Sequence, residues 1–208
     1  MAARHAKAIA HLKTVDPVLG AWIDQVGPCG WKRAGDGSHF DHITRSIVYQ
    51  QLSGAAAATI YGRFVALYGT GNGAPTPKQV ASTPDAKLRS VGLSGRKAEY
   101  IKDLAKRTHE GSLAVNSIHE MDNDEVMETL TSVRGIGEWT AQMVLMFRLG
   151  RPDVLPVLDL GVQKAVKMLY KLRSHPKPDR VAKIGACWAP YRTVASWYLW
   201  RRVDDPPQ

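Results

Sequence analysis

The stretch Thr129–Gly161 reads TLTSVRGIGEWTAQMVLMFRLGRPDVLPVLDLG, and its pattern predicts two short amphipathic helices joined by a glycine turn. Leu130 and Val133 lie three residues apart and continue an apolar stripe up to the turn. A second stripe begins directly after it with Thr140 and Met143. Two apolar stripes broken only by a short Gly-x-Gly segment predict a helical hairpin.

The glycines of this hairpin favour contact with a phosphate. Gly135 and Gly137 permit positive φ and carry no Cβ, so a phosphate can approach the backbone closely. The next helix begins there, and its free N–H groups and positive dipole end would face that phosphate. A plain helix–turn–helix with a glycine C-cap is the alternative. The residues predicted to bind phosphate are Arg134, Gly135, Ile136, Gly137 and Thr140, with Ile136 also packing back between the helices.

Helical periodicity extends over most of the chain and predicts an all-α fold of about ten short helices. Residues 69–75 are loop-forming by composition. Asp122, followed three residues later by Glu125, predicts a capping box. Helices are expected at 40–51, after Ser53, at 77–82, 84–91, 96–109, from Asp122, and at 160–172, 180–188 and 190–202.

The composition indicates a globular protein with a polyanionic partner. Hydrophobic residues make up 44% of the 208 residues, and the net charge is +9. Nucleic acid or an anionic membrane surface fits this charge, and an ordinary basic protein remains the alternative. No apolar run approaches the ~20 residues of a membrane span, and the N-terminus lacks a signal-peptide core. Cys29 and Cys187 are too few for a zinc cage or an iron–sulfur cluster, so two buried thiols in a reducing compartment are expected.

Four segments together resemble a known family. They are Thr129–Gly161, Ile47–Ser53 (IVYQQLS), Leu88–Lys97 (LRSVGLSGRK) and Trp188–Trp200 (WAPYRTVASWYLW). The chain is similar to the helix-hairpin-helix-Gly-Pro-Asp superfamily of base-excision DNA glycosylases. Within it, the 3-methyladenine DNA glycosylase II branch, the AlkA-like alkylbase glycosylases, matches best. The resemblance spans about residues 38–202.

The resemblance implies one catalytic unit over residues 1–208, folded as two lobes with a DNA-binding cleft between them. One lobe is expected from about 1–45 together with 159–208. The other is expected from about 46–158 and includes the hairpin at 133–139. Larger bacterial relatives have an extra N-terminal β-rich domain, which this chain is expected to lack.

By the same resemblance, Asp159 is the catalytic aspartate. It follows Trp139 by twenty residues and stands before a predicted helix. Breaking an N-glycosidic bond builds positive charge on the sugar, which an ionised carboxylate stabilises while it orients or deprotonates the attacking water. The alternative role, a helix N-cap, is compatible with catalysis. Asp153 is the nearby acidic rival.

Trp139 indicates the reaction subtype. In relatives that also cut the DNA strand, a lysine stands at this position and forms a Schiff base. No lysine occurs between Arg134 and Arg151. The resemblance therefore implies a monofunctional enzyme that hydrolyses the base from the sugar and has no lyase activity at abasic sites.

Further residues receive roles from the resemblance. Leu52 is predicted to be the wedge that enters the base stack when the target base is flipped, beside Gln51, which would contact the opposite base. A buried leucine between helices is the alternative. An electron-rich ring attracts a cationic alkylated purine, although core packing is the other role for these side chains. The predicted base pocket consists of Trp139, Trp200, Tyr49, Met143 and Tyr191.

No cofactor is expected to be required. The family often holds a monovalent cation, Na⁺ or K⁺, at the hairpin through backbone carbonyls, which would map onto Thr131, Val133 and Gly135. A second phosphate-binding segment is predicted at the start of a helix, where a solvated helix face is the alternative. Its residues are Ser94, Gly95, Arg96 and Lys97.

The expected activity is excision of 3-methyladenine and 7-methylguanine from double-stranded DNA by a monomer in the bacterial cytoplasm, associated with the nucleoid. Leu158 departs from the pattern, because many relatives have an acidic residue there, and Met143 stands where some have an aromatic one. A glycosylase for oxidised or mismatched bases and a non-catalytic DNA-binding module are the two alternatives.

Overall fold

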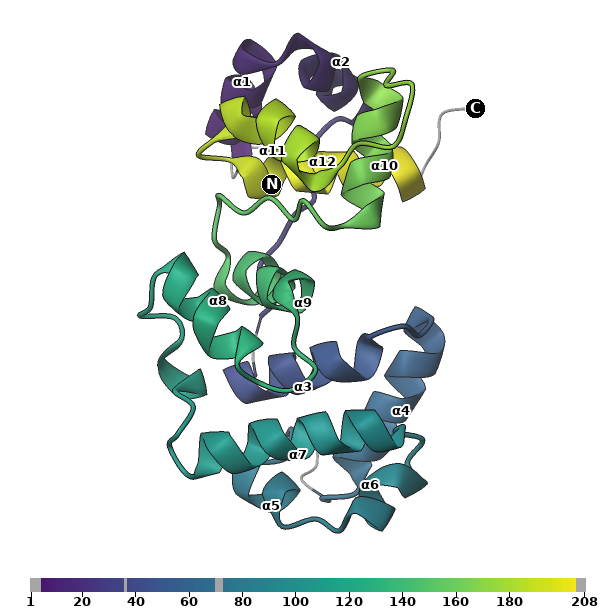
Figure 1. The fold of residues 1–208 in the computed structure, drawn as a ribbon, viewed down its shortest axis with the longest axis vertical. Coiled ribbons are helices and arrows are strands. Elements are labelled where there is room, and N and C mark those ends of the chain that lie inside the picture. Colours follow the sequence, from purple (N-terminus) through teal and green to yellow (C-terminus); the bar gives the residue numbers. More distant parts are fainter. Residues whose placement is uncertain (1–4, 36, 70–72, 205–208) are drawn as a thin grey trace. The chain divides into compact units, whose positions relative to one another are not determined.

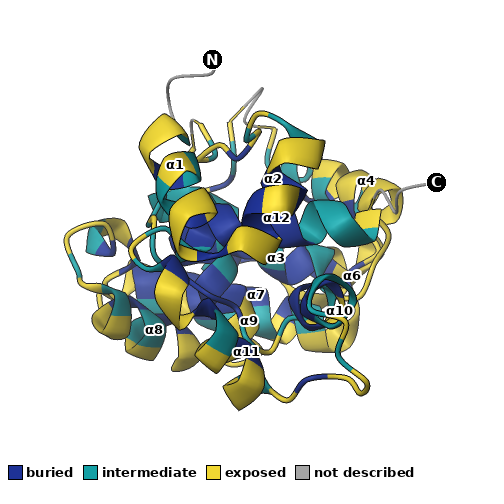
Figure 2. Cartoon of the chain, turned by 90° about the horizontal axis from the view of Figure 1, so that it is seen from above, coloured by how far each residue is buried: buried dark blue, intermediate teal, exposed yellow. Residues whose placement is uncertain are grey.

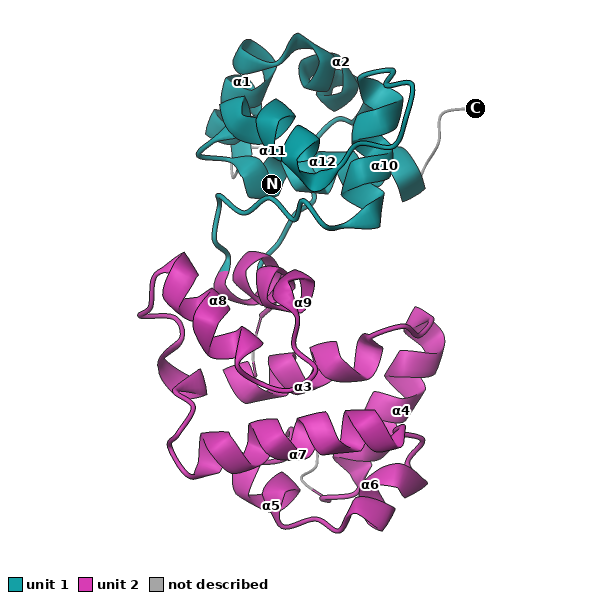
Figure 3. Cartoon of the chain, viewed as in Figure 1, with its two compact units in different colours: residues 1–33, 150–208 teal, residues 34–149 magenta. Residues whose placement is uncertain are grey.

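The computed structural model describes residues 5–35, 37–69 and 73–204. These residues form helices and connecting segments without a strand, which confirms the predicted all-α fold. The chain divides into two compact units (Figure 3). Unit 1 contains Met1–Arg33 and Gly150–Gln208, and unit 2 contains Ala34–Leu149. The predicted loop at 69–75 lies partly outside the described residues.

Unit 2 is built around its longest helix, α7, which packs against α3, α5 and α6. In Figure 1, α3 and α7 run side by side. Their facing sides bury Ile43, Ile47, Ile101 and Leu104 completely. The helices are α3 His39–Tyr49, α4 Gly54–Ala66, α5 Pro77–Ala81, α6 Asp85–Ser90, α7 Gly95–His109, α8 Asn123–Thr131 and α9 Glu138–Met143, with a 3-10 turn Val115–Ser117 and a π-helical turn Val144–Leu149.

The helix starts of unit 2 follow the predicted capping chemistry. The Ser53 hydroxyl accepts a hydrogen bond from the backbone N–H of Ala56 and begins α4. Asp122 and Glu125 form the predicted capping box at α8, with reciprocal bonds of 2.9 and 2.8 Å. Side-chain acceptors satisfy N–H groups that the first helical turn leaves without partners, so these residues set where each helix begins.

Unit 1 joins the two ends of the chain. Its helices are α1 Ala6–Val15, α2 Pro17–Val26, α10 Leu160–Leu169, α11 Pro178–Gly185 and α12 Arg192–Asp204, with a 3-10 turn Ala186–Trp188. Helix α12 packs against α1, α2 and α10. The largest fully buried side chains of the unit are Trp188 and Tyr198. Figure 2 shows in dark blue the residues that these helices bury.

Asp16 joins three parts of unit 1. Its Oδ1 caps α2 by accepting from the N–H groups of Val18 and Leu19, both at 3.0 Å. Its Oδ2 accepts from the Trp188 indole at 2.7 Å and from the Tyr170 hydroxyl. Burial and this carboxylate raise the pKa of Tyr170. A buried carboxylate with four donors is a structural element of the core.

The unit boundaries lie at 33/34 and 149/150, whereas the sequence predicted about 45/46 and 158/159. The first differs because Arg148 donates to the carbonyls of Gly35 and Gly37, and the N–H of Ala34 donates to Phe147 O at 2.6 Å. The segment before α3 therefore belongs to unit 2. The second differs because residues 151–154 bond to the start of α12.

Two further expectations concern the thiols and the membrane. Cys29 is half-buried and Cys187 is exposed, so the expectation of two buried thiols is wrong for Cys187, which lies on a surface 3-10 turn. Desolvation raises the pKa of both thiols. In the described part of the chain, no helix has the length and apolarity needed to cross a bilayer.

Candidate functional site

The hairpin turn between α8 and α9 depends on Gly135. Its φ is +81°, which is the left-handed region that favours glycine. A Cβ at this position would lie 2.0 Å from Cδ2 of Tyr100, so the turn packs directly on the Tyr100 ring. Both observations require glycine. The neighbouring Ile136 is 3% exposed, which confirms that it packs into the unit.

Gly137 has a different role from the predicted one. Its φ is −91°, so the expectation of positive φ is wrong here; the residue is extended and precedes α9 as an N-cap without a side chain. A Cβ at Gly137 would meet nothing within 4 Å. The backbone at Gly137 is therefore open to an approaching group, and no side chain of the N-cap residue caps α9. Arg134 lies exposed next to it.

The QQLS segment forms the turn between α3 and α4. Gln51 has a φ of +55°, which is uncommon for a residue other than glycine. Leu52 follows with 40% of its surface exposed, so the alternative of a buried leucine does not hold. We call Gln50–Ser53 the wedge turn. It presents the apolar side chain predicted to enter the base stack.

Gln50 connects the wedge turn to the hairpin, and sequence reasoning missed it. Its side-chain Nε2 donates to Gly135 O at 3.0 Å and to Thr140 Oγ1 at 3.2 Å. Thr140, predicted to bind phosphate, is buried. Gln50 and Gly135 are 85 residues apart, so no local pattern indicates the contact.

The predicted phosphate segment at the start of α7 divides into two parts. Ser94, Gly95 and Arg96 are exposed, and Ser94 caps the helix. The Lys97 ammonium group instead donates to Val48 O and Gln50 O, both at 2.7 Å. Burial lowers the pKa of Lys97. Its observed partners are thus the carbonyls at the end of α3, and phosphate binding by this segment stays a prediction.

The pocket residues of unit 2 lie on α9 and α3. Trp139, in the first turn of α9, is 43% exposed and so is not a core residue. Met143 ends the same helix and is half-buried. Tyr49 bonds to the guanidinium of Arg45, which stacks over its ring at 4.9 Å from the centroid. Their predicted contacts with a base stay predictions.

Asp159 lies at the start of α10 in unit 1. Its Oδ1 accepts from the N–H of Val162 at 2.8 Å, which confirms the N-cap, and from the Trp200 indole N–H at 2.9 Å. A Cβ at Gly161 would lie 3.0 Å from that oxygen and 3.1 Å from Trp200 Cδ1. The glycine therefore lets the indole approach the carboxylate. Leu158 is 46% exposed beside it.

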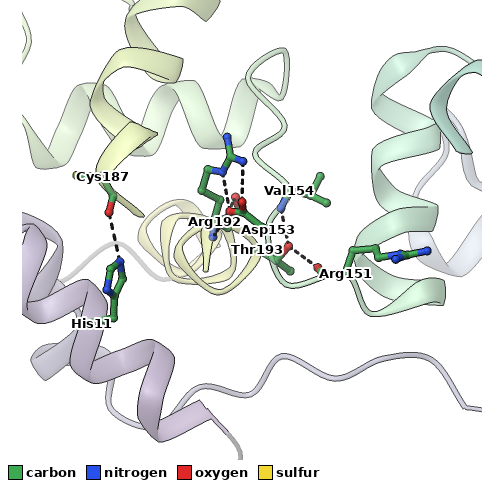
Figure 4. Close-up of polar contacts among 8 residues, drawn as sticks. His11, Arg151, Asp153, Val154, Cys187, Arg192 and Thr193 are labelled. Carbon is green, nitrogen blue, oxygen red and sulfur yellow. Dashed lines mark hydrogen bonds and ion pairs between the residues drawn. The ribbon is translucent and has the colours of Figure 1, made fainter. Parts of the chain in front are cut away.

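Asp153, the acidic rival, is engaged elsewhere in unit 1. Its two carboxylate oxygens pair with Nε and Nη2 of Arg192 at 2.6 and 2.7 Å (Figure 4). This pairing holds the pKa of Asp153 below its usual value. Beside it, Thr193 donates to Arg151 O at 2.7 Å and accepts from the N–H of Val154 at 3.0 Å. Asp153 thus fastens the chain to α12.

Tyr191 lies with the N-terminal helix. Its ring meets His11 edge-on, with 5.4 Å between centroids. It also lines a cavity of about 500 Å³ together with His5, Lys7 and Trp31. These contacts describe a different neighbourhood from the Asp159–Trp200 pair, and a role of Tyr191 in base binding stays a prediction.

The carbonyls predicted to hold a cation are partly engaged. Val133 O accepts from the N–H of Ile136 at 3.1 Å, and Gly135 O accepts from Gln50. Two of the three oxygens of the predicted set, Thr131, Val133 and Gly135, thus each accept one N–H donor and keep a second lone pair, and cation binding by this set stays a prediction. No group of three metal-ligating side chains occurs among the described residues.

Unit 2 contains a glycine hairpin with open backbone and an exposed apolar turn, and unit 1 contains a capped carboxylate bonded to an indole. A model of the HhH-GPD superfamily of base excision DNA repair proteins matches residues 44–190. The chain belongs to the HhH-GPD superfamily. This match confirms the predicted family, and the relatives below confirm its alkylbase branch.

The relatives of this HhH-GPD chain are similar over most of its length. DNA-3-methyladenine glycosylase 1 of Schizosaccharomyces pombe is 33% identical over 197 residues, covering 94% of this chain and 86% of the relative. The alkylbase DNA glycosidase-like protein mag2 of the same yeast is 32% identical over 198 residues, covering 95% and 93%. The chain spans only 60% of a Bacillus subtilis relative to which it is 36% identical.

The fold is similar to that of a solved family member. The structure of S. pombe 3-methyladenine DNA glycosylase in complex with abasic DNA superposes with a TM-score of 0.85 at 32% identity, covering 96% of this chain and 98% of the other. The helix order described above is thus the HhH-GPD fold.

Proposed function

We propose that this chain is a monofunctional DNA glycosylase that hydrolyses the N-glycosidic bond of alkylated bases, chiefly 3-methyladenine and 7-methylguanine, in duplex DNA. The observation that carries the proposal is the Asp159 carboxylate, which is predicted to be catalytic and which accepts hydrogen bonds from two donors, the Val162 N–H and the Trp200 indole. The names of the relatives support the substrate class.

The carboxylate supplies the charge that the reaction needs. Departure of the base leaves positive charge on the sugar ring, and a fixed negative group stabilises it more than a mobile one, because no reorganisation is needed. Two donors on one oxygen of Asp159 fix the carboxylate's orientation. Water then attacks the sugar, with the carboxylate orienting it or accepting its proton.

An alkylated purine requires little acid catalysis. Methylation at N3 or N7 makes the base cationic, and it leaves as a neutral molecule without prior protonation. An indole face attracts such a cation by about 0.5–2 kcal/mol. Trp200, which is bonded to Asp159, and the exposed Trp139 are the side chains we assign to this stacking.

The proposal that the enzyme is monofunctional rests on Trp139. The residue that follows Gly137 by two positions is a lysine in enzymes that also cleave the strand, and an amine is needed to form the Schiff base. An indole nitrogen cannot form one. The product is therefore an abasic site, and strand cleavage is not expected.

Unit 2 supplies the grip on the DNA. The bare backbone at Gly137 and the exposed Arg134 suit a phosphate, and Leu52 is exposed as a wedge must be. The net charge of +9 supports a polyanionic partner. A monomer bound to duplex DNA, base flipping and a cytoplasmic, nucleoid-associated location complete the proposal.

A panel of lesion duplexes tests the proposed function. Purified protein is incubated with duplexes that carry 3-methyladenine, 7-methylguanine, 8-oxoguanine or a mismatch, and released bases are identified by mass spectrometry. Release of the methylated purines is expected. Release of only the oxidised or mismatched base would favour the second type of glycosylase, and binding without any release would favour a non-catalytic module.

A further inference from the structure

One side of helix α7 contacts both the end of α3, where the wedge turn begins, and the hairpin turn between α8 and α9. Lys97, Tyr100, Asp103 and Arg107 are spaced three, three and four residues apart, so they lie along one helix face. Lys97 holds the end of α3, and Tyr100 lies against Gly135. The wedge turn and the hairpin turn therefore contact neighbouring positions of the same helix, α7.

The rest of that face anchors the hairpin. Asp103 Oδ2 accepts from the N–H of Arg134 at 3.5 Å. Arg107 donates to Ser132 O at 2.8 Å and to its hydroxyl at 3.0 Å. The α8–α9 turn is thus held to α7 at three successive positions.

Gln50 links the wedge turn directly to the hairpin turn. Its backbone carbonyl accepts from Lys97, and both bonds of its side-chain amide nitrogen reach the hairpin, at Gly135 and Thr140. A primary amide has two N–H donors, and both are used here. The residue is therefore held at its backbone by α7 and at its side chain by the hairpin.

The position after Gln50 is conformationally costly. A left-handed φ at a residue other than glycine is unfavourable and persists only where its surroundings impose it. Gln51 has such a φ, between the anchored Gln50 and the helix cap at Ser53. This geometry determines where the next side chain, Leu52, is presented.

We propose that Gln50 is a positioning residue that couples the hairpin to the wedge turn. It fixes Leu52 at a set distance from the backbone that holds the phosphate, so that phosphate binding carries Leu52 into the base stack. Without the amide bonds, the hairpin still binds the strand and Leu52 is still present, but insertion is less complete. The inference rests on the proposed function, in which the hairpin grips DNA and Leu52 inserts.

A double-mutant cycle separates this role from a purely structural one. The variants are Gln50→Met, which keeps the side-chain length and removes the donors, Leu52→Ala, and the two combined. The probe is a duplex with a tetrahydrofuran abasic site and 2-aminopurine next to it, whose fluorescence rises on unstacking. Anisotropy on the same duplex gives the Kd. Gln79→Met is the matched control, because it removes the side-chain hydrogen bonds of an exposed capping glutamine in α5 of the same unit, away from the hairpin and the wedge turn.

The effects of Gln50→Met and Leu52→Ala on the fluorescence gain are expected to be non-additive. Gln50→Met is expected to lower the fluorescence gain at saturation by roughly half or more while the Kd changes less than about threefold. In the Leu52→Ala background, Gln50→Met is expected to change the gain no further. Gln79→Met is expected to behave as wild type. An unchanged gain in Gln50→Met, or an equal loss in both backgrounds, would overturn the proposal.

A second variant guards against loss of folding. Thr140→Val is nearly isosteric and removes one acceptor of the Gln50 amide from the opposite side, so a smaller loss of the same kind is expected. If Gln50→Met fails to fold, the test rests on Thr140→Val. An unchanged fluorescence gain in Thr140→Val would then overturn the proposal. Because the probe requires no excision, wild-type protein that unstacks the probe but releases no base would refute the glycosylase and leave the role of Gln50 intact.

Discussion

The Trp200 indole N–H donates to Oδ1 of Asp159 across 2.9 Å, on the same oxygen that caps α10. The ring assigned to the cationic base and the carboxylate assigned to the sugar are thus joined by one hydrogen bond. Displacing the indole therefore changes the orientation of the carboxylate as well.

Trp200→Phe keeps an aromatic face and removes the N–H donor. A hydrogen bond to a charged group contributes about 1.5–3 kcal/mol, and 1.4 kcal/mol is a tenfold change, so a single-turnover excision rate lower by roughly tenfold or more is expected. The Kd for an abasic-analogue duplex is expected to stay within a few-fold. A rate equal to that of wild type would show that the bond does not contribute.

Gly161→Ala is expected to separate activity from stability. The new methyl group would lie 3.0 Å from Asp159 Oδ1 and 3.1 Å from Trp200 Cδ1, so one of them has to shift. Alanine in a helix is favoured over glycine by roughly 1 kcal/mol, which offsets the crowding. Excision is expected to fall about tenfold or more with little change in thermal midpoint. Full activity in the variant would contradict the close packing of these groups.

Lys97→Met distinguishes structural from phosphate-binding roles. Loss of two hydrogen bonds to carbonyls is expected to lower the free energy of unfolding by about 1–3 kcal/mol, measured by urea denaturation. The slope of log K against log salt for duplex binding is expected to stay the same. A slope reduced by about one in Lys97→Met would show instead that Lys97 contacts a phosphate. Arg96→Met, one residue earlier and exposed, is the matched comparison.

The Asp153–Arg192 pair predicts a pH-dependent stability. The folded pKa of Asp153 lies below 3.8, so its ionised form stabilises unit 1 above that pH, and the stabilisation is lost as the pH falls through the folded pKa. Asp153→Asn is expected to be less stable by about 1 kcal/mol at pH 7, because the side chains of Arg192 and Asp153 are 36% and 28% exposed and solvent weakens the pair. The difference is expected to shrink as the pH falls below the ordinary pKa range of an aspartate carboxyl, because the folded pKa of Asp153 is lowered. A difference that is constant with pH would contradict the ion pair.

Local chemistry was predictable from the sequence, and long-range pairing was not. The capping residues Ser53, Asp122 and Asp159 and the turn at Gly135 were predicted because their partners lie within a few residues. Gln50 escaped notice because its partner lies 85 residues away.

Other differences have equally physical reasons. Helices α1 and α2 were not predicted, although Asp16 followed by Pro17 is a typical start of a helix. Gly137 is extended, and no atom lies within 4 Å of the place where its Cβ would be. The sequence alone does not distinguish a glycine that leaves such space from one that needs a positive φ. Asp153 was a rival to Asp159 in the sequence because its partner, Arg192, lies far along the chain on α12. Only the fold brings the two side chains together, and their ion pair gives Asp153 a structural role.

The most direct test of the central claim is single-turnover release of 7-methylguanine from a methylated duplex by wild type and Asp159→Asn. The asparagine keeps an oxygen for the Val162 cap and the Trp200 bond but has no charge. Loss of about 100-fold or more in rate is expected, with the Kd for an abasic-analogue duplex within a few-fold of wild type. An unchanged rate of release by Asp159→Asn would contradict the role of this carboxylate.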